Sequence, residues 1–317
     1  MDPLSQVIGQ SKPKSITVGA TDVGGEIAIS FPAHDGAYFY SVASDDCWLE
    51  MDGVAPLRLY AGDCVVLPSG RRFCLSSAIG LPPTEAAVVF GDRPNGSIAA
   101  YNGGGRCMMF AAHFEFDSGF SRFLLDGLDA VVRIDDPAAK AAMRDAIEQM
   151  IGELQRGEPG SAMVVAHLAH IALIKTLRFH LSEVAHARPG WLYALADRRL
   201  SMAIAAMHAA PAERWSVASL AATCALSRTA FALRFKDKVG MTPMDYLLQL
   251  RMLLAARRLL EPGARVAQVA QELGYQSESA FNVAFKRQMG LPPRRYAASA
   301  RSATPAPTSP AQPSSPG

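Results

Sequence analysis

The sequence is poor in cysteine and lacks the cysteine spacings that build metal or disulfide sites. Its 317 residues include five cysteines, an odd number, and no Cys-x-x-Cys pair. A chain of this length buries enough apolar surface to fold without covalent cross-links. We therefore expect free thiols in a reducing compartment rather than a disulfide framework. The five are Cys47, Cys64, Cys74, Cys107 and Cys224.

Long hydrophobic runs are also missing. The N-terminus, MDPLSQVIGQSKPKS, has no apolar core of the length found in signal peptides. The most apolar long stretch, 163–177, is interrupted by His167, His170 and Lys175, and it is too short to span a bilayer. These features predict a soluble, cytoplasmic protein with no membrane segment.

Charged residues are sparse, at 19% of the chain, and the net charge of +2 conceals an asymmetry. Residues 1–197 contain 15 lysines and arginines against 23 aspartates and glutamates, a balance of −8. Residues 198–317 contain 16 against 6, a balance of +10. An acidic half joined to a basic half is typical of proteins in which one domain binds nucleic acid. Charge alone is about equally compatible with a basic domain that is merely soluble and binds no nucleic acid.

Short apolar runs separated by turn residues fill the segment 24–133 and predict antiparallel strands of a sandwich or barrel. After Pro137 the pattern changes, because 138–154 and 161–184 carry apolar residues at intervals of three and four. These two segments predict amphipathic helices. The clearest strand candidates are 37–43, 47–51, 57–60 and 64–67.

The basic half contains an internal repeat. WSVASLAATCALSRTAFALRFK (215–236) and ARVAQVAQELGYQSESAFNVAFK (264–286) share an apolar-Ala pair, a turn, a serine and Phe-x-x-x-Phe-Lys. The offset grows from 49 residues at Ala221 and Ala270 to 50 at Ser227 and Ser277, so the second turn has one extra residue. Each unit predicts a short helix, a tight turn and a second helix that its serine caps.

The segment between the two units predicts a long helix. Thr242-Pro243 combines a capping residue with proline at the first helical position, and Glu261-Pro262-Gly263 ends the pattern. Eighteen helical residues rising about 1.5 Å each make a strut of roughly 27 Å. Recognition helices on such a strut suit successive major grooves, which are roughly 34 Å apart.

The C-terminal hundred residues resemble the AraC/XylS family of transcription regulators. The resemblance is carried by LSRTAFALRFKDKVGMTPMDYL, RMLLAARRLL and VAQVAQELGYQSESAFNVAFKRQMGLPPRRY. Upstream, 57–70 and 190–211 are similar to the branch of the family whose sensor is a cupin. The resemblance implies an α+β two-domain fold with an antiparallel β jelly roll, a helical dimerisation segment and an all-α domain with helix-turn-helix units at 217–236 and 266–287. It also implies an activator and homodimer that binds double-stranded DNA, RNA polymerase and a small organic effector.

The sequence departs from the family pattern in both recognition helices. Leu233 and Val283 stand where the family often carries arginine, so guanine recognition by arginine is lost there. Ala225 stands where the family usually has a turn glycine, and a left-handed alanine costs about 1 kcal/mol. Asn282 is suited to an adenine edge, although a solvated surface role is open as well. The DNA-binding candidates are Arg228, Thr229, Ala232, Leu233, Lys236, Ser279, Asn282, Val283, Lys286 and Arg287.

The cupin resemblance raises an alternative, a cupin metalloenzyme fused to a DNA-binding domain. The second cupin motif needs Gly, five residues, Pro-x-Gly, two residues and a histidine ligand. Gly62, Pro68 and Gly70 fit, but Phe73 occupies the histidine position, and 38–50 contains no histidine. Because a divalent metal needs three or four ligands, we expect no metal, no cofactor and no catalytic residues.

The sensor domain then takes an organic effector or nothing. Its aromatic strand residues suggest a ring-lined cavity, although rings that simply fill the sandwich are nearly as compatible. The cavity candidates are Tyr38, Tyr40, Trp48, Arg71, Phe73 and His113. The predicted division of the chain is an N-terminal extension (1–23), the sensor (24–134), the helical segment (135–188), the DNA-binding domain (189–300) and a disordered tail (301–317).

Overall fold

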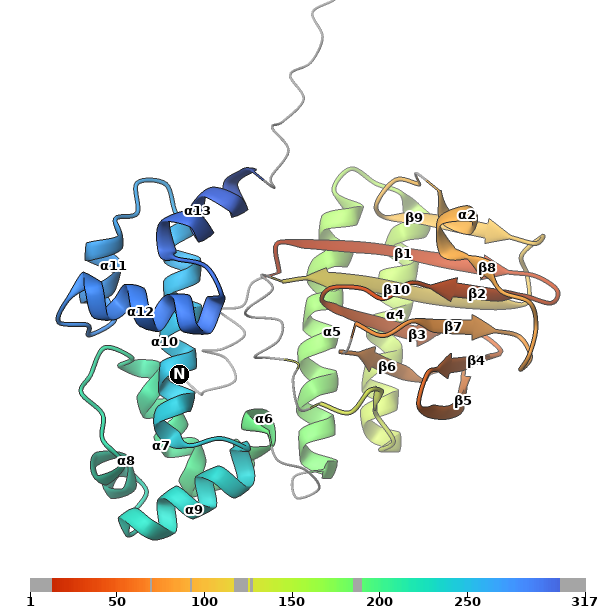
Figure 1. The fold of residues 1–317 in the computed structure, drawn as a ribbon. Helices are drawn as coiled ribbons and strands as arrows, with labels where there is room; N and C mark the ends of the chain where they lie inside the picture. Colours follow the sequence, from red (N-terminus) through yellow and green to blue (C-terminus); the bar gives the residue numbers. More distant parts are fainter. Residues whose placement is uncertain are drawn as a thin grey trace, which may run out of the picture.

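The chain folds into a β-sandwich flanked by two long helices and a separate helical domain (Figure 1), as seen in a computed structural model. The structure describes residues 13–68, 70–91, 93–116, 125, 128–184 and 190–302. The predicted two-domain organisation, with a β-rich N-terminal part and a helical C-terminal part, is confirmed. The predicted disordered tail lies outside the described residues, except for its first two positions.

The sandwich consists of a six-stranded sheet in the order β11-β6-β3-β10-β1-β9 and a five-stranded sheet in the order β5-β4-β7-β2-β8. Most neighbours are antiparallel, while β1 with β9 and β2 with β8 are parallel pairs. The strands are β1 Ser15–Val23, β2 Ala28–Phe31, β3 Ala37–Val42, β4 Asp46–Met51, β5 Val54–Tyr60, β6 Cys64–Leu67, β7 Phe73–Ser76, β8 Thr84–Glu85, β9 Ser97–Tyr101, β10 Cys107–Glu115 and β11 Val132–Arg133, with a short helix α2 at Ala86–Phe90.

Strand alternation divides the sensor into two apolar layers. In β10, Met109 points between the two sheets, whereas Phe110 and Phe114 point to the opposite face of the six-stranded sheet. Because successive side chains in a strand face opposite ways, β3 does the same, with Tyr40 inside the sandwich and Phe39 outside it. The six-stranded sheet is therefore apolar on both faces and needs a cover.

Helices α4 (Pro137–Arg156) and α5 (Ser161–Val184) supply that cover. They pack against each other, and α4 contacts β1 and β9 while α5 contacts β1, β6 and β11. The apolar stripes of both helices thus have a partner within the chain. Asp63, 3% exposed, fastens this layer by binding Arg133 at 3.2 Å and Lys140 at 2.7 Å.

Helix α5 is long and apolar enough to cross a membrane by length and composition, with a mean hydropathy of 1.4 over Ser161–Leu181. This stretch is longer than the run 163–177, so length alone does not exclude a span. Its buried residues, among them Val165, Ala169 and Leu173, pack in the apolar layer beneath the six-stranded sheet. Packing on the sheet therefore accounts for part of the apolar character of the helix, since 33% of the apolar window is buried.

The first strand corrects the predicted domain boundary. β1 pairs with β10 along its whole length, from Ser15 opposite Glu115 to Val23 opposite Cys107. It lies inside the six-stranded sheet rather than in an extension that ends at residue 23. The sequence analysis missed it because the partner strand lies about ninety residues away, so local patterns do not reveal the pairing.

The helical domain follows the predicted repeat. Ser227 and Ser277 accept hydrogen bonds from the backbone N–H of Ala230 and Ala280, and so cap the two recognition helices as expected. The strut α10 begins at Pro243 with Thr242 as its cap and ends at Leu260, the predicted 18 residues. The helices are α6 Trp191–Ala194, α7 Arg198–Ala209, α8 Val217–Thr223, α9 Arg228–Val239, α10 Pro243–Leu260, α11 Val266–Glu272, α12 Glu278–Met289 and α13 Pro293–Ser302.

Candidate DNA-binding surface and sensor cavity

The recognition helices α9 and α12 each bury one face against their own unit. Phe231 and Phe235 are fully buried in α9, and Phe281 and Phe285 are fully buried in α12. Figure 1 shows the two helices near opposite ends of α10. The phenylalanines fix the rotation of each helix, so the side chains between them face outward.

The outward faces of α9 and α12 match position by position at an offset of 50 residues. Leu233 is 67% exposed and Val283 is 69% exposed, the two highest values among the large hydrophobic side chains exposed in the helical domain. The two helices therefore share an exposed large apolar side chain at equivalent positions. Around them lie the exposed Thr229 and Lys236 in α9 and the exposed Ser279 and Lys286 in α12, with Ala232 and Asn282 half-buried.

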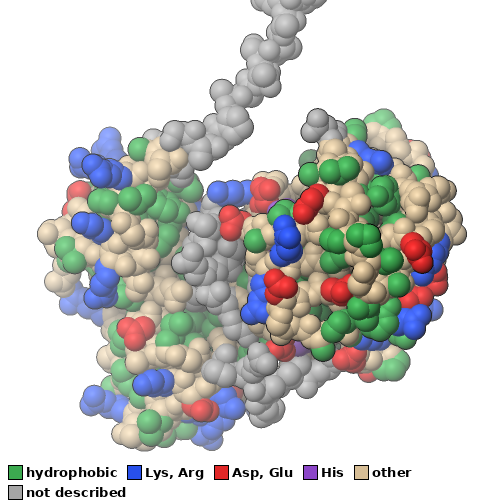
Figure 2. Space-filling model, turned by 45° about the vertical axis from the view of Figure 1, so that its right-hand side comes forward, with side chains coloured by type: hydrophobic (Ala, Val, Ile, Leu, Met, Phe, Trp, Pro, Cys, Tyr) green, Lys and Arg blue, Asp and Glu red, His purple; other side chains and the backbone are tan. Residues whose placement is uncertain are grey.

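The cations of the helical domain fall into two groups. Arg228, Lys236, Lys286 and Arg287 are exposed and make no ion pair among the described residues, which leaves them available to phosphates. Figure 2 shows lysine and arginine side chains along the outer edge of this domain. These four cations lie on the two helices that carry the matched apolar pair, while Arg198, Arg199, Arg214, Arg265 and Arg295 are exposed elsewhere on the domain.

Other arginines are engaged inside the protein. In α9, Arg234 donates from Nε to Asp197 at 2.6 Å. Burial raises the pKa of the Asp197 carboxyl, but Arg234 and two backbone N–H groups outweigh it and hold the pKa below its ordinary value. Arg251 binds the Pro211 carbonyl, and Arg258 pairs with Glu272. The sequence analysis did not reveal these pairings.

The loop after α7, which leads into the first helix-turn-helix unit, contacts both α10 and the turn of the second unit. Arg251 donates from Nε to the Pro211 carbonyl at 2.6 Å and from Nη2 to the Glu213 carbonyl at 2.8 Å. A Cβ on Gly274 would lie 2.2 Å from the Ala212 carbonyl oxygen, so the second turn packs directly on this loop. The spacing of the recognition helices is thereby fixed by more than the strut.

The turns of the two units differ as the sequence indicated. Ala225 has φ +51° and Gly274 has φ +81°, both in the left-handed region that favours glycine. The first unit therefore carries backbone strain that the second avoids. Four residues separate α8 from α9 and five separate α11 from α12, which is the extra residue expected in the second turn.

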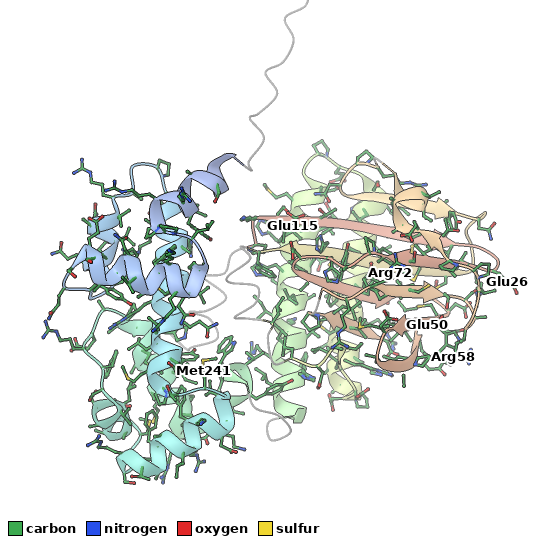
Figure 3. The ribbon with its side chains drawn as sticks, in the orientation of Figure 1. Glu26, Glu50, Arg58, Arg72, Glu115 and Met241 are labelled. Carbon is green, nitrogen blue, oxygen red and sulfur yellow. The ribbon has the colours of Figure 1, made fainter. Side chains whose placement is uncertain are left out.

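A cavity of about 260 Å³ lies between the two sheets of the sensor. Rings from β2, β3 and α2 form much of its wall, with Phe31 5.8 Å from Tyr40 and 6.0 Å from Phe90 between ring centroids. In Figure 3, Glu115 marks the end of β10 nearest the helical domain, two residues beyond the cavity residue His113. The lining is Thr17, Val18, Gly19, Ala20, Thr21, Ile29, Phe31, Tyr38, Tyr40, Leu75, Phe90, Arg93, Pro94, Asn95, Ser97, Ala99, Met109, Ala111 and His113.

Three of the six residues expected at the cavity line it: Tyr38, Tyr40 and His113. Phe73 lies behind the wall and stacks on Phe31 at 4.6 Å. The expectation needs correction for Trp48 and Arg71, which lie elsewhere. Because side chains alternate along β4, Trp48 points away from the sandwich core. The guanidinium carbon of Arg58 lies 5.7 Å from the centroid of its ring. Arg71 is exposed and donates to the Asp52 carbonyl at 3.3 Å.

Two histidines lie at or beside the cavity, and both contact Tyr38. His113 donates from Nε2 to the Asp35 carbonyl at 2.8 Å, and its ring stacks on Tyr38 at 4.3 Å. His34, which the sequence analysis did not single out, packs edge-on against Tyr38 at 4.6 Å. Burial and then the neighbouring His113 lower the pKa of His34 to about 4, so this ring is neutral at pH 7.

The sensor contacts the helical domain through α5 and α6. His180 of α5 lies with Nε2 3.2 Å from the Tyr193 hydroxyl of α6 and 3.8 Å from the Asp129 carboxylate. On its other side α6 packs against α9, and the Gly190 N–H donates to the Lys238 carbonyl at 2.7 Å. The short helix α6 therefore links the sensor to the first recognition helix.

The cysteines and histidines do not converge on a metal. Within the described residues, no three His, Cys, Asp or Glu side chains form a group that could hold a metal ion. All five cysteines are free thiols, and Phe73 is buried in the core where a cupin ligand would stand.

Comparison with known proteins assigns both parts of the chain. Residues 2–182 match the family described as Cupin, and residues 220–299 match the family described as Helix-turn-helix domain. A Streptomyces lividans protein named as an AraC-like transcription regulator is 38% identical over 299 residues, covering 93% of this chain and 98% of its own.

Two further similarities are more distant. The HTH-type transcriptional regulator AlkR of Acinetobacter baylyi is 28% identical over 303 residues, covering 93% of this chain and 99% of its own. The solved DNA-binding domain of AdpA, a global transcriptional factor, in complex with a target DNA is 35% identical, with a TM-score of 0.30. It covers 32% of this chain and 90% of its own.

Proposed function

This chain belongs to the family of AraC-like DNA-binding transcription regulators with a cupin domain, and from that premise we propose how it acts. A homodimer in the cytoplasm binds a specific site in double-stranded DNA through α9 and α12. A small organic effector enters the metal-free cavity of the sensor, and the protein then activates transcription through contact with RNA polymerase.

The matched outward faces of α9 and α12 carry this proposal. Leu233 and Val283, equally exposed at equivalent positions, are suited to thymine methyl groups in the major groove. Asn282 has the donor and acceptor that an adenine edge requires. The exposed Lys236 and Lys286, one turn further along each helix, are placed for phosphates, which add affinity without sequence information.

The charge balance supports the same assignment. The residues from Arg198 onward carry +10, whereas those before them carry −8. Binding by the helical domain should therefore weaken steeply with salt, because each neutralised phosphate releases counterions. A fragment of about 197–301 that folds but shows no salt-dependent DNA binding would count against the proposal.

Dimerisation is proposed through the outer face of α5. One face of α5 packs on the sheet. Elsewhere on the helix the side chains of Met163, Val164 and Ile171 are 69%, 45% and 49% exposed, respectively. A second copy of the same helix would cover these side chains in a symmetric contact. Sedimentation of the full chain should show a dimer, and Met163→Glu with Ile171→Glu should produce a monomer. A dimer that survives both substitutions would move the interface elsewhere.

The test of sequence recognition compares two substitutions on one helix. With a site selected from random duplexes, Asn282→Ala should weaken specific binding by roughly 1–3 kcal/mol and leave random-DNA binding almost unchanged. Lys286→Ala should weaken both alike and lower the salt slope by about one. Equal losses on both DNAs for Asn282→Ala would show that this face of α12 does not contact bases.

The enzyme alternative requires a bound metal. We propose that the sensor works without one, since Phe73 replaces a cupin ligand. Metal analysis of the purified protein decides between the two. A stoichiometric transition metal that resists dialysis would favour the enzyme.

A further inference from the structure

The sensor cavity contains one buried hydrogen-bond donor without a partner. Tyr40 of β3 lines the cavity and is 4% exposed, and its hydroxyl makes no hydrogen bond among the described residues. A buried hydroxyl without a partner is destabilising, and native proteins rarely keep one without a reason. The hydroxyl is therefore a candidate ligand contact.

The Tyr40 phenol keeps its proton at neutral pH and remains a hydrogen-bond donor there. Burial, and then the neighbouring Tyr38, raise the pKa of the Tyr40 phenol well above its ordinary value. A neutral phenol on a residue that lines a cavity can donate to an acceptor oxygen of a bound molecule. An acceptor on the ligand would satisfy the O–H proton, which a donor on the ligand would not.

The wall around this donor suits a flat apolar molecule. Phe31, Tyr38, Tyr40 and Phe90 present ring faces and edges, and Phe31 contacts the other three at 5.8–6.1 Å between centroids. Aromatic groups pack favourably edge-to-face or offset against such rings. Ile29, Leu75 and Met109 complete an apolar lining.

The charges of the lining disfavour both ionic alternatives beside Tyr40. No described lining residue is an aspartate or glutamate, and the one charged lining residue, Arg93, is exposed. An ammonium group would meet no anion among these residues. A carboxylate beside Tyr40 would be buried among neutral groups without a cation, which is costly.

We propose that the cavity binds an uncharged aromatic compound whose carbonyl oxygen accepts a hydrogen bond from Tyr40. The ring lies among Phe31, Tyr38 and Phe90, and the carbonyl points to the Tyr40 hydroxyl. This inference rests on the proposed sensing function and names the chemical class of its effector. It does not depend on the DNA-binding assignment.

Four probes of nearly equal shape test the class by calorimetric titration of the full chain. Acetophenone has the uncharged acceptor, ethylbenzene lacks it, benzoate is an anion and benzylamine is a cation. Acetophenone should bind at least tenfold more tightly than the other three. Equal or tighter binding of benzoate or benzylamine, or no binding of acetophenone, would overturn the proposal.

Tyr40→Phe is the matched substitution, because it removes the hydroxyl and keeps the ring. It should weaken acetophenone about tenfold and leave ethylbenzene unchanged, as expected for the loss of one hydrogen bond. It should also raise the melting temperature of the free protein, because an unpartnered buried hydroxyl is gone. Unchanged acetophenone affinity in this variant would remove Tyr40 from the site.

A second variant fills the space instead of changing its chemistry. Ala111 of β10 lines the cavity, and Ala111→Leu should abolish binding of acetophenone and ethylbenzene alike. Binding that persists in it would place the probes outside the cavity. DNA binding measured on the same preparations separates the two proposals. Probe binding without DNA binding would refute the proposed function alone, and DNA binding without probe binding would refute this inference alone.

Discussion

A buried histidine in the DNA-binding domain makes folding stability depend on pH. His208 ends α7, is 3% exposed, and has Nε2 2.7 Å from the hydroxyl of Tyr246 in α10. Its Nδ1 is buried without a partner among the described residues. Burial lowers the pKa of His208 from 6.5 to about 4. The folded protein therefore holds this ring neutral where the unfolded chain would protonate it.

The sign and size of the effect follow from proton linkage. Between pH 6.5 and about 4 the unfolded state binds the extra proton, so stability is full above this window and falls as the pH drops through it. Lowering the pH from 7 to 5 should cost about 2 kcal/mol of unfolding free energy through this residue alone.

The assay is urea denaturation of the full chain at both pH values, with His208→Gln as the perturbation. Glutamine can still bond Tyr246 but does not titrate, so the variant should lose about 2 kcal/mol less than the parent between pH 7 and 5. An identical pH dependence in His208→Gln and the parent would refute the reasoning.

Three further predictions concern other parts of the molecule. Ala225→Gly should raise the unfolding free energy by up to about 1 kcal/mol, because it removes left-handed strain. Gly274→Ala should lower the unfolding free energy by more than about 2 kcal/mol. Melting curves in which the two variants shift in the same direction would contradict this. Asp63→Ala should lower the unfolding free energy by about 3 kcal/mol, because Arg133 and Lys140 lose a buried partner. A decrease below about 1 kcal/mol in urea denaturation would show that these ion pairs contribute little to stability. Replacing contacted thymines of the selected site by uracil should weaken binding by about 0.8 kcal/mol per methyl lost from Leu233 or Val283, and unchanged affinity would show that neither side chain touches a methyl.

The local structure of the helical domain was largely predictable from its sequence. Capping residues, turn residues and the spacing of buried phenylalanines are short-range signals, and they located α10 from Pro243 to Leu260 to the residue. The extra residue in the second turn was equally visible, because a repeat supplies its own internal comparison.

Long-range partners were not predictable. β1 pairs with a strand about ninety residues away, and Arg251 binds carbonyls forty residues earlier in the chain. A single sequence contains no local signal for such pairings. Trp48 is a different case, since strand alternation in β4 could have shown that it faces away from the residues between the sheets.

The cavity residues were likewise only partly predictable from the sequence. Tyr38, Tyr40 and His113 were found because they carry rings in the segment predicted to form strands, and all three line the cavity. Phe90 was missed, because the short helix α2 that carries it has too few residues to leave a periodic pattern.

The most direct test of the central claim is a hydroxyl-radical footprint of the full chain on a site selected from random duplexes. If α9 and α12 act together on the strut α10, each protomer should protect two regions on one face of the duplex, separated by one turn of about 10 base pairs. Methylation interference should mark the major groove in both regions. A single protected groove per protomer, or a selection that enriches no sequence, would contradict the account.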